Sequence, residues 1–146
     1  MADEKIPGIM RDFCRALEAK DTGRLLSFFA DDGSWITPEG AFKGKDEIRR
    51  FLKWQFDQVH DIKITERGNG IIAQGNTAFY EHMIAGTVRG VKAEYLSLCA
   101  WEFKDDKIKA LRTVNDRLSL ARQVARGWPA KWLVSLAANQ AEKGLR

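Results

Sequence analysis

The spacing of hydrophobic residues changes once along the chain, from helical in about the first 60 residues to alternating after them. In the first part, apolar residues recur every three or four positions, which is the spacing of a helix that buries one face. This pattern predicts helices over about residues 4–19, 21–29 and 44–59, with Asp21 as the N-cap of the second. A short strand, residues 34–37, precedes the third helix.

From Asp61 onward the pattern has period two, as in strands that bury one face. It predicts long strands joined by turns rich in Gly, Asn and Asp, over about residues 61–72, 77–86, 91–103 and 107–115. Gly68-Asn69-Gly70 interrupts the first of them and predicts a bulge or turn. Three helices followed by an antiparallel meander, without repeats or a linker, indicate a single α+β domain over residues 1–146.

The segment after Asp116 has helical spacing again, and we interpret residues 117–146 as a C-terminal extension of the same domain. In its second half, Trp128, Trp132 and Leu136 share one helix face. We expect this face to pack on the domain or on a second copy of the chain. A lid over a cavity is the alternative.

Composition is that of an ordinary globular protein, with 45% hydrophobic and 30% charged residues among 146. The net charge of +4 is spread along the chain without a basic block, so we expect no nucleic-acid binding and at most a weak preference for anionic ligands. No apolar run reaches the length of a membrane span, and the first residues do not resemble a signal peptide. Cys14 and Cys99 lie in apolar stretches and are expected to be reduced, so we expect a cytoplasmic protein without membrane contact.

His82 is the strongest chemical signal in the sequence. It stands in the strand predicted over residues 77–86, where it alternates with Tyr80 and Ile84 on one face. An imidazole in the middle of such a face can transfer protons near neutral pH. The alternative is a core histidine that hydrogen-bonds to a neighbour.

Four segments carry a resemblance to a known family: residues 13–21, 26–35, 40–48 and 101–108. In sequence and order they resemble the nuclear transport factor 2-like superfamily, in its SnoaL-like branch, over about residues 5–118. The resemblance implies a curved antiparallel sheet wrapped into a cone, with the three N-terminal helices closing one end over an apolar pocket. It leaves the activity open, because such domains serve as cyclases, isomerases, epoxide hydrolases, dehydratases and non-catalytic binding or dimerisation modules.

The acidic residues that several of these enzymes use are absent here. The positions that carry the tyrosine and two aspartic acids of the steroid isomerases look like Phe13, Cys99 and Thr37. The Arg, Asp and Asp of the limonene-type epoxide hydrolases look like His82, Ile84 and Thr113. Thr113 also stands where the cyclases have a catalytic aspartate. A carboxylate base is therefore missing from each of these family positions.

The remaining polar residues resemble the scytalone-type dehydratases, which use two histidines, tyrosines and a hydroxyl–Asn pair two residues apart. The matching residues here are His60, His82, Tyr80, Tyr95, Thr113 and Asn115. His60 has an alternative reading as a surface residue at the end of the third helix, where a cation suits the helix dipole.

Strand alternation predicts which side chains face the pocket. We expect His82 to shuttle a proton, Tyr95 to polarise a carbonyl and Asn115 to orient the substrate or the imidazole. The side chains expected to hold the substrate are Trp35, Thr37, Tyr80, Ser97, Trp101 and Thr113. Such an aromatic cavity suits a small apolar or aromatic molecule. Two histidines without nearby acidic or thiol partners indicate no metal site, and we expect no organic cofactor.

These residues suit a cofactor-free lyase, isomerase or cyclase. Two other interpretations stay open, a non-catalytic domain that binds a hydrophobic ligand and a dimerisation module. On the opposite side of the sheet, Phe79, Leu96 and Leu98 belong to an apolar centre that we expect a homodimer to bury.

Overall fold

The computed structural model describes residues 2–144 and places side chains from residue 5 onward. The N-terminal half contains α1 (Ala2–Glu18), α2 (Thr22–Phe28), β1 (Phe29–Thr37), β2 (Gly40–Lys43) and α3 (Gly44–Gln58). The rest contains β3 (Val59–Gln74), β4 (Thr77–Val88), β5 (Val91–Lys104), β6 (Lys107–Asn115), α4 (Arg117–Val124) and α5 (Gly127–Ala141). The predicted α+β class is confirmed, and so is the order of three helices, strands and C-terminal helices.

Side-chain caps explain where several helices begin. The Asp21 carboxylate accepts a hydrogen bond from the Arg24 backbone N–H at 2.9 Å, which confirms the predicted cap of α2. Asp116 starts α4 in the same way, through the Ser119 backbone N–H at 2.9 Å. At α3, the Glu47 carboxylate in the first turn accepts from the backbone N–H of the N-cap residue, Lys43, at 2.7 Å.

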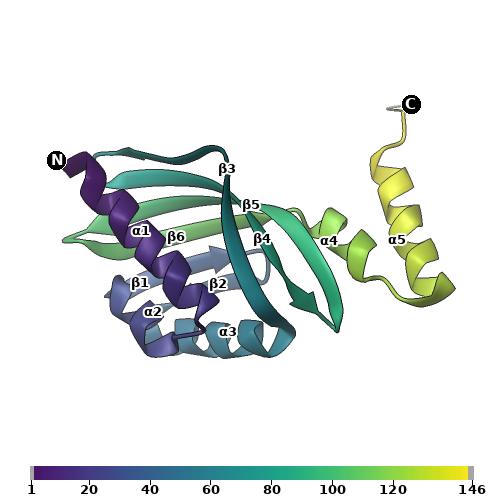
Figure 1. Cartoon of the computed structure of the whole chain (residues 1–146), viewed down its shortest axis with the longest axis horizontal. Coiled ribbons are helices and arrows are strands. Elements are labelled where there is room, and N and C mark those ends of the chain that lie inside the picture. Colours follow the sequence, from purple (N-terminus) through teal and green to yellow (C-terminus); the bar gives the residue numbers. More distant parts are fainter. Residues whose placement is uncertain (1, 145–146) are drawn as a thin grey trace.

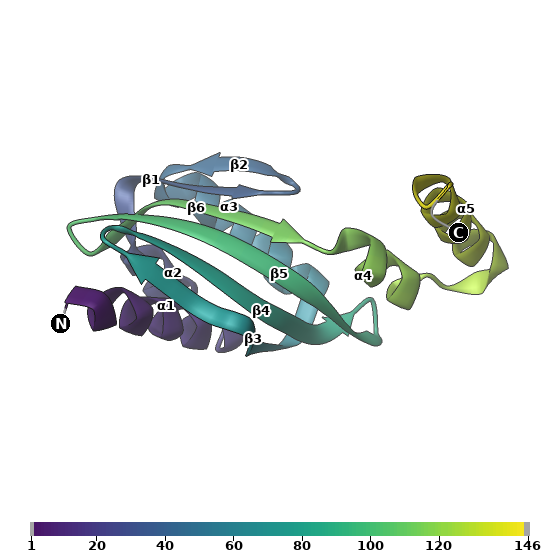
Figure 2. The same ribbon diagram turned by 90° about the horizontal axis from the view of Figure 1, so that it is seen from above.

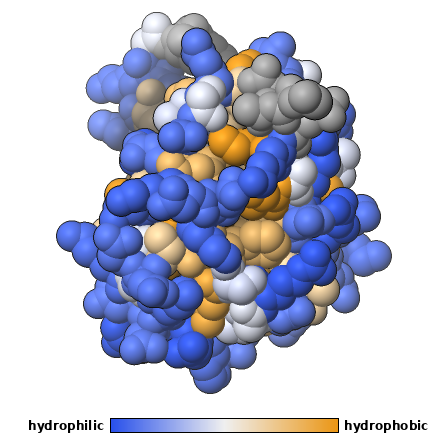
Figure 3. Space-filling view, turned by 90° about the vertical axis from the view of Figure 1, so that its left-hand side faces the viewer, coloured by the Kyte–Doolittle hydropathy of each residue, from blue (hydrophilic) through white to orange (hydrophobic). Residues whose placement is uncertain are grey.

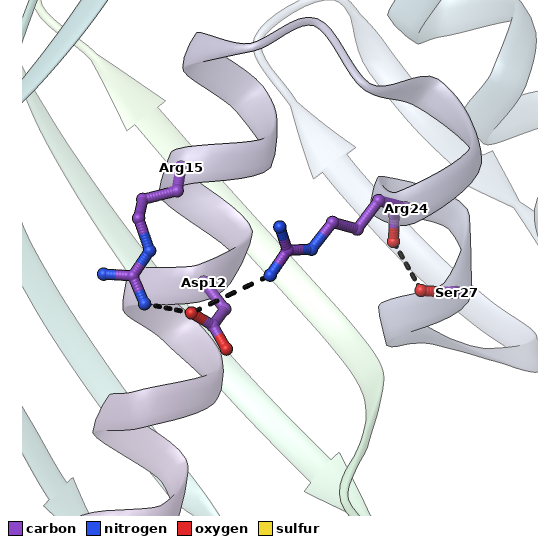
Figure 4. A network of polar contacts seen from close by, with 4 residues as sticks. All are labelled: Asp12, Arg15, Arg24 and Ser27. Atoms are coloured by element: carbon purple, nitrogen blue, oxygen red, sulfur yellow. Dashed lines mark hydrogen bonds and ion pairs between the residues drawn. The ribbon is translucent and has the colours of Figure 1, made fainter.

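Asp12 links α1 to α2 at the surface. Its carboxylate accepts a hydrogen bond from Arg15 and lies 4.0 Å from the Arg24 guanidinium, while the Ser27 hydroxyl donates to the Arg24 carbonyl at 2.6 Å (Figure 4). These side chains are largely exposed, so each ion pair contributes at most about 1 kcal/mol. The network therefore orients α2, whose attachment rests on its buried leucines, Leu25 and Leu26.

The sheet has six strands in the order β2-β1-β6-β5-β4-β3, and it is curved without closing into a barrel (Figure 1). Strands β3 to β6 form the predicted antiparallel meander. A register shift between Glu66 and Ile71 confirms the predicted irregularity at Gly68-Asn69-Gly70. The chain reverses between β5 and β6 through Asp105 and Asp106, both at positive φ, as a type I′ hairpin turn requires.

The sheet is antiparallel as predicted, except that β1 runs parallel to β6. A two-residue hairpin enforces antiparallel pairing only between strands that follow each other in sequence. The chain between β1 and β6 passes through α3 and four further strands, so no such constraint acts on this pair. The short strand β2, which pairs antiparallel with β1, was not predicted.

α1 and α3 cover the same face of the sheet, and the core lies between them and the strands (Figures 1 and 2). Phe13 of α1 is at the centre of this core. Its ring makes edge contacts with Trp101 and Trp35, with centroid distances of 5.1 and 5.6 Å. At the end of the molecule where α1 begins, polar side chains dominate the surface and apolar ones show between them (Figure 3).

The C-terminal helices leave the body of the domain. The Gln123 side chain holds α4 against β5, because it accepts from the Glu94 backbone N–H at 2.9 Å and donates to the Glu94 carbonyl at 2.7 Å. α5 follows and stands away from the sheet (Figures 1 and 2). The last two residues of the predicted extension, 145–146, lie outside the described residues.

The α5 stripe does not pack on its own domain, which is one of the two partners expected for it, and packing on a second copy of the chain stays a prediction. Trp128, Trp132 and Leu136 are 79%, 57% and 50% exposed. Only Ala125 and Arg126 separate α4 from α5, and the hydrogen bonds of Gln123 fix α4, so α5 points away from the sheet. Within residues 2–144, no helix is long and apolar enough to cross a membrane.

Candidate functional site

A cavity of about 650 Å³ lies between α1, α3, α4 and the concave face of the sheet. All nine residues predicted to face a pocket line it: Trp35, Thr37, Tyr80, His82, Tyr95, Ser97, Trp101, Thr113 and Asn115. Their chemical roles stay predictions. His60 is not part of the lining; it is exposed in β3, with Nδ1 3.1 Å from Lys20 Nζ.

Three polar residues form a row across the sheet side of the cavity. The strand register pairs His82 with Ser97 and Ser97 with Asn115. Side chains of directly paired residues lie on the same face of a sheet. The imidazole, the hydroxyl and the amide are therefore neighbours on β4, β5 and β6.

His82 is buried and uncharged at neutral pH. The residue is only 4% exposed. Burial lowers the pKa of His82 from 6.5 to about 4, and a hydrogen bond with the Tyr80 backbone opposes this shift. Nδ1 has no hydrogen-bond partner among the described residues. His82 is thus a neutral imidazole in the wall of the cavity.

The other titratable groups inside the cavity are also uncharged at neutral pH. Burial raises the pKa of Tyr95 to about 12, and the charge of Glu39 adds to this shift. Burial likewise raises the pKa of Tyr80 and of Cys99, and it raises that of Cys14 to about 12. The tyrosines are therefore hydrogen-bond donors and the cysteines are unreactive thiols.

Trp35 and Thr37 come from β1, and hydrogen bonds connect Trp35 to the polar side chains of the central strands. The Trp35 indole N–H donates to Thr113 Oγ1 at 3.0 Å. Thr113 Oγ1 lies 3.5 Å from Cys99 Sγ, which lies 3.9 Å from Ser97 Oγ. This chain fixes the wall of the cavity, so Thr113 has less hydrogen-bonding capacity free than Asn115 does.

Four buried side-chain atoms among the described residues have no hydrogen-bond partner in the protein: Gln55 Oε1, His82 Nδ1, Trp101 Nε1 and Asn115 Oδ1. All four residues line the cavity. An unpaired buried polar group costs about 1 to 3 kcal/mol, and here this cost is concentrated in residues around one cavity.

Several polar lining residues were not predicted from the sequence, among them Gln55, Glu39, Arg89 and Arg117. Gln55 is one turn beyond Phe51, so a polar residue on the buried stripe of α3 was the available signal. Glu39, in the turn after β1, and Arg89, in the turn after β4, gave no signal of their own. Arg117 continues the alternation of Thr113 and Asn115 but lies in α4.

Glu39 changes the view that the site lacks a carboxylate. It stands outside the family positions compared above, yet it lines the cavity, and its charge acts on Tyr95. It lies 4.0 Å from the Arg117 guanidinium. As for metals, the described residues contain no group of three or more His, Cys, Asp or Glu side chains able to hold an ion.

Comparison with solved structures places this architecture among known ones. A protein with a ketosteroid isomerase-like fold from Catenulispora acidiphila DSM 44928, solved with trimethylamine, has a TM-score of 0.75 at 18% identity, covering 86% of this chain and 97% of its own. A nuclear transport factor 2-like protein from Burkholderia xenovorans LB400 has a TM-score of 0.69 at 24% identity, covering 84% and 98%. An M. tuberculosis epoxide hydrolase of the LEH-like type has a TM-score of 0.72 at 17% identity, covering 94% and 98%.

At these identities the likeness shows the fold and leaves the activity open. No curated protein matches the chain in sequence. The family model of the SnoaL-like domain matches residues 10–111, which is most of the chain and ends before α4. The chain therefore belongs to the SnoaL-like branch of the nuclear transport factor 2-like superfamily.

Proposed function

We propose that the protein binds a small apolar or aromatic molecule in this cavity and carries out cofactor-free acid/base chemistry on it, of the lyase, isomerase or cyclase type. His82 is the proton shuttle. The observation that carries the proposal is the buried, neutral imidazole in the wall of the cavity, in one row with Ser97 and Asn115.

The chemistry common to these reaction types is enolisation. His82 takes a proton from the carbon next to a carbonyl, and the electron pair of the broken C–H bond moves toward the carbonyl oxygen. The protonated Tyr95 hydroxyl donates a hydrogen bond to that oxygen, and Asn115 orients the substrate. The proton then returns to another carbon in an isomerisation, or to a departing hydroxyl group in a dehydration. In a cyclisation, the enolate carbon attacks a second carbonyl and the proton goes to the new alkoxide.

The low pKa of His82 sets a condition on this mechanism. A base with a pKa of about 4 is weak at neutral pH. The enolate that forms next to it is negatively charged, and an adjacent negative charge favours the imidazolium. Proton uptake by His82 and charge development on the substrate therefore have to occur together.

A non-catalytic binding domain is the second candidate, and the cavity walls favour it. Phe13, Trp35, Phe51, Trp101 and Leu111 provide a wall that would hold an apolar ligand without any reaction. In this case the polar row of His82, Ser97 and Asn115 serves only to recognise the ligand. A pure dimerisation module, the third candidate, gives this row no role.

The test is proton exchange in D2O. The protein is incubated with a panel of cyclic β-hydroxyketones and β,γ-unsaturated ketones, and deuterium uptake next to the carbonyl is followed by NMR. We expect His82→Gln to lower the exchange rate by about 10²- to 10⁴-fold while folding is retained. His60→Gln is the matched control, because it removes the other histidine, which lies outside the cavity. Equal rates in wild type and His82→Gln contradict the mechanism, and binding without exchange supports the second candidate.

A further inference from the structure

The cavity has an uncharged interior and a charged mouth. The lining residues that are exposed mark the mouth: Glu39, Trp54, Gln58, Arg89 and Arg117. The titratable side chains deeper inside are uncharged at neutral pH, since burial lowers the pKa of His82 and raises that of Tyr80, Tyr95 and both cysteines. A charged ligand group therefore finds its counter-charge only at the mouth.

Positive charge predominates there. Arg89 is in the β4–β5 turn and has no ion-pair partner within residues 5–144. Arg117, at the start of α4, has only the loose contact of 4.0 Å with Glu39. The Arg126 guanidinium supplies a third positive charge near this turn. One of its nitrogens lies 3.4 Å from the point that a Cβ of Gly90, the residue after Arg89, would occupy. Glu39 is the one carboxylate among the lining residues that the structure describes.

We propose that the ligand is an amphipathic organic anion, with its apolar body in the cavity and one carboxylate, sulfonate or phosphate group at the mouth, where Arg89 and Arg117 supply the positive charge. This inference rests on the proposed function in taking the cavity as the ligand site, and it adds the substrate class. Guanidinium groups suit such anions because their donors form a planar fork. The apolar body then places its reacting carbon near the row of His82, Ser97 and Asn115.

Two naphthalene probes of similar size separate charge from apolar contact. 1-Anilinonaphthalene-8-sulfonate is anionic, and N-phenyl-1-naphthylamine is its neutral counterpart. We expect Arg89→Gln and Arg117→Gln each to weaken binding of the sulfonate by about 2- to 5-fold, the range of exposed ion pairs, and to leave the neutral probe unchanged. Glu39→Gln should strengthen sulfonate binding, since it removes the competing carboxylate from Arg117. Sulfonate affinity should also fall as salt is added.

Arg67→Gln is the matched control, because it removes the same charge from an exposed position on β3 outside the cavity. Ala121→Phe tests whether the probes bind in the cavity, because the larger side chain on the α4 wall fills part of it. Both probes should bind this variant more weakly, and circular dichroism checks that it folds. If the neutral probe binds in the cavity but sulfonate affinity is the same in wild type and the arginine variants, the anion proposal is overturned and the proposed function stands. If Ala121→Phe affects neither probe, the cavity is not their site, and both proposals are overturned.

Discussion

The imidazole of His82 stacks on the phenol ring of Tyr80, with ring centroids 4.3 Å apart and 22° between the planes. The two residues are two positions apart on β4 and so share its concave face. The stack covers one face of the imidazole with an apolar ring. It is one source of the burial that keeps His82 uncharged.

Removing the Tyr80 ring should therefore raise the pKa of His82. In Tyr80→Ala, water gains access to the imidazole, and we expect its pKa to move from about 4 toward the ordinary 6.5. Tyr80→Phe keeps the ring and should leave the value nearly unchanged. An NMR titration of the imidazole carbon-bound protons measures both variants. If the pKa of His82 is the same in Tyr80→Ala as in the wild type, the stack does not control the charge of the imidazole.

The buried neutral imidazole should make the protein less stable in mild acid. The unfolded chain binds a proton at His82 with a pKa near 6.5, whereas the folded chain does so only near 4. The contribution to stability is therefore complete above pH 6.5 and is lost as the pH falls from 6.5 to about 4. We expect about 2 to 3 kcal/mol less unfolding free energy at pH 4.5 than at pH 7.5 from this residue.

Urea unfolding at the two pH values measures this effect, and His82→Gln isolates it because the carboxylates of both proteins titrate alike. The pH dependence of the variant should be smaller by the same amount. Identical pH dependence in the two proteins would contradict the assigned burial.

Gly33 should be required where β1 meets β6. A Cβ at this position would stand 2.8 Å from the Ile108 carbonyl oxygen and 2.9 Å from that of Ala30, both of them backbone atoms. Gly33→Ala should therefore lower the unfolding free energy by about 1 to 3 kcal/mol, the usual range for overpacking. Gly8→Ala is the matched control, because Gly8 lies in α1 with no atom within 4 Å of the added Cβ. That variant should be neutral or slightly stabilising in the same denaturation experiment.

We predict a homodimer through the convex face of the sheet. The register places Ile72 beside Phe79 and Leu98 beside Val114, and Phe79 and Val114 are 62% and 66% exposed. Large apolar side chains exposed together on one face of a sheet are unusual on a monomer, and a second copy fits them because a two-fold axis brings like patches together. Sedimentation equilibrium should give twice the chain mass for the wild type and the single mass for Phe79→Lys/Val114→Lys. Asp57→Lys, at an exposed position of α3 on the other side of the sheet, makes the same change in net charge and should keep the dimer; a monomeric wild type at micromolar concentration would contradict the prediction.

Deleting α5 should cost the isolated domain little stability. Its large apolar side chains are exposed, and Ala138 is its buried residue, so a chain ending at Arg126 should lose no more than about 1 kcal/mol. If the stripe packs on a second copy instead, the truncated chain should dissociate at higher concentrations than the full chain does. Thermal melting and sedimentation of the two chains separate these effects. A large loss of stability in a monomeric sample would show that α5 supports its own domain.

Residues whose environment depends on strand alternation could be predicted from sequence. Period two assigned His82, Ser97 and Asn115 to the concave face, and the structure places them in one row. The β1–β6 pairing could not be read from a pattern, because it joins distant segments by parallel hydrogen bonding. Glu39 and Arg89 were missed because a turn residue reaches a cavity only through tertiary structure.

The α5 stripe shows the opposite failure. Helical spacing correctly placed Trp128, Trp132 and Leu136 on one face, yet the partner of that face depends on where α4 directs the chain. An amphipathic pattern identifies a surface that needs covering and carries no information about what covers it.

The α4 wall also has a consequence for how this binding site changes over time. Leu118, Leu120, Ala121 and Val124 shape one side of the cavity from a helix that follows the part matched by the family model. Gln123 attaches that helix to β5 through backbone atoms of Glu94, which any residue at that position would offer. Substitutions in these eight residues can therefore reshape the chamber while the strands and their polar row keep their inherited geometry. Selection for a new ligand, natural or in the laboratory, has a short and separable segment on which to act.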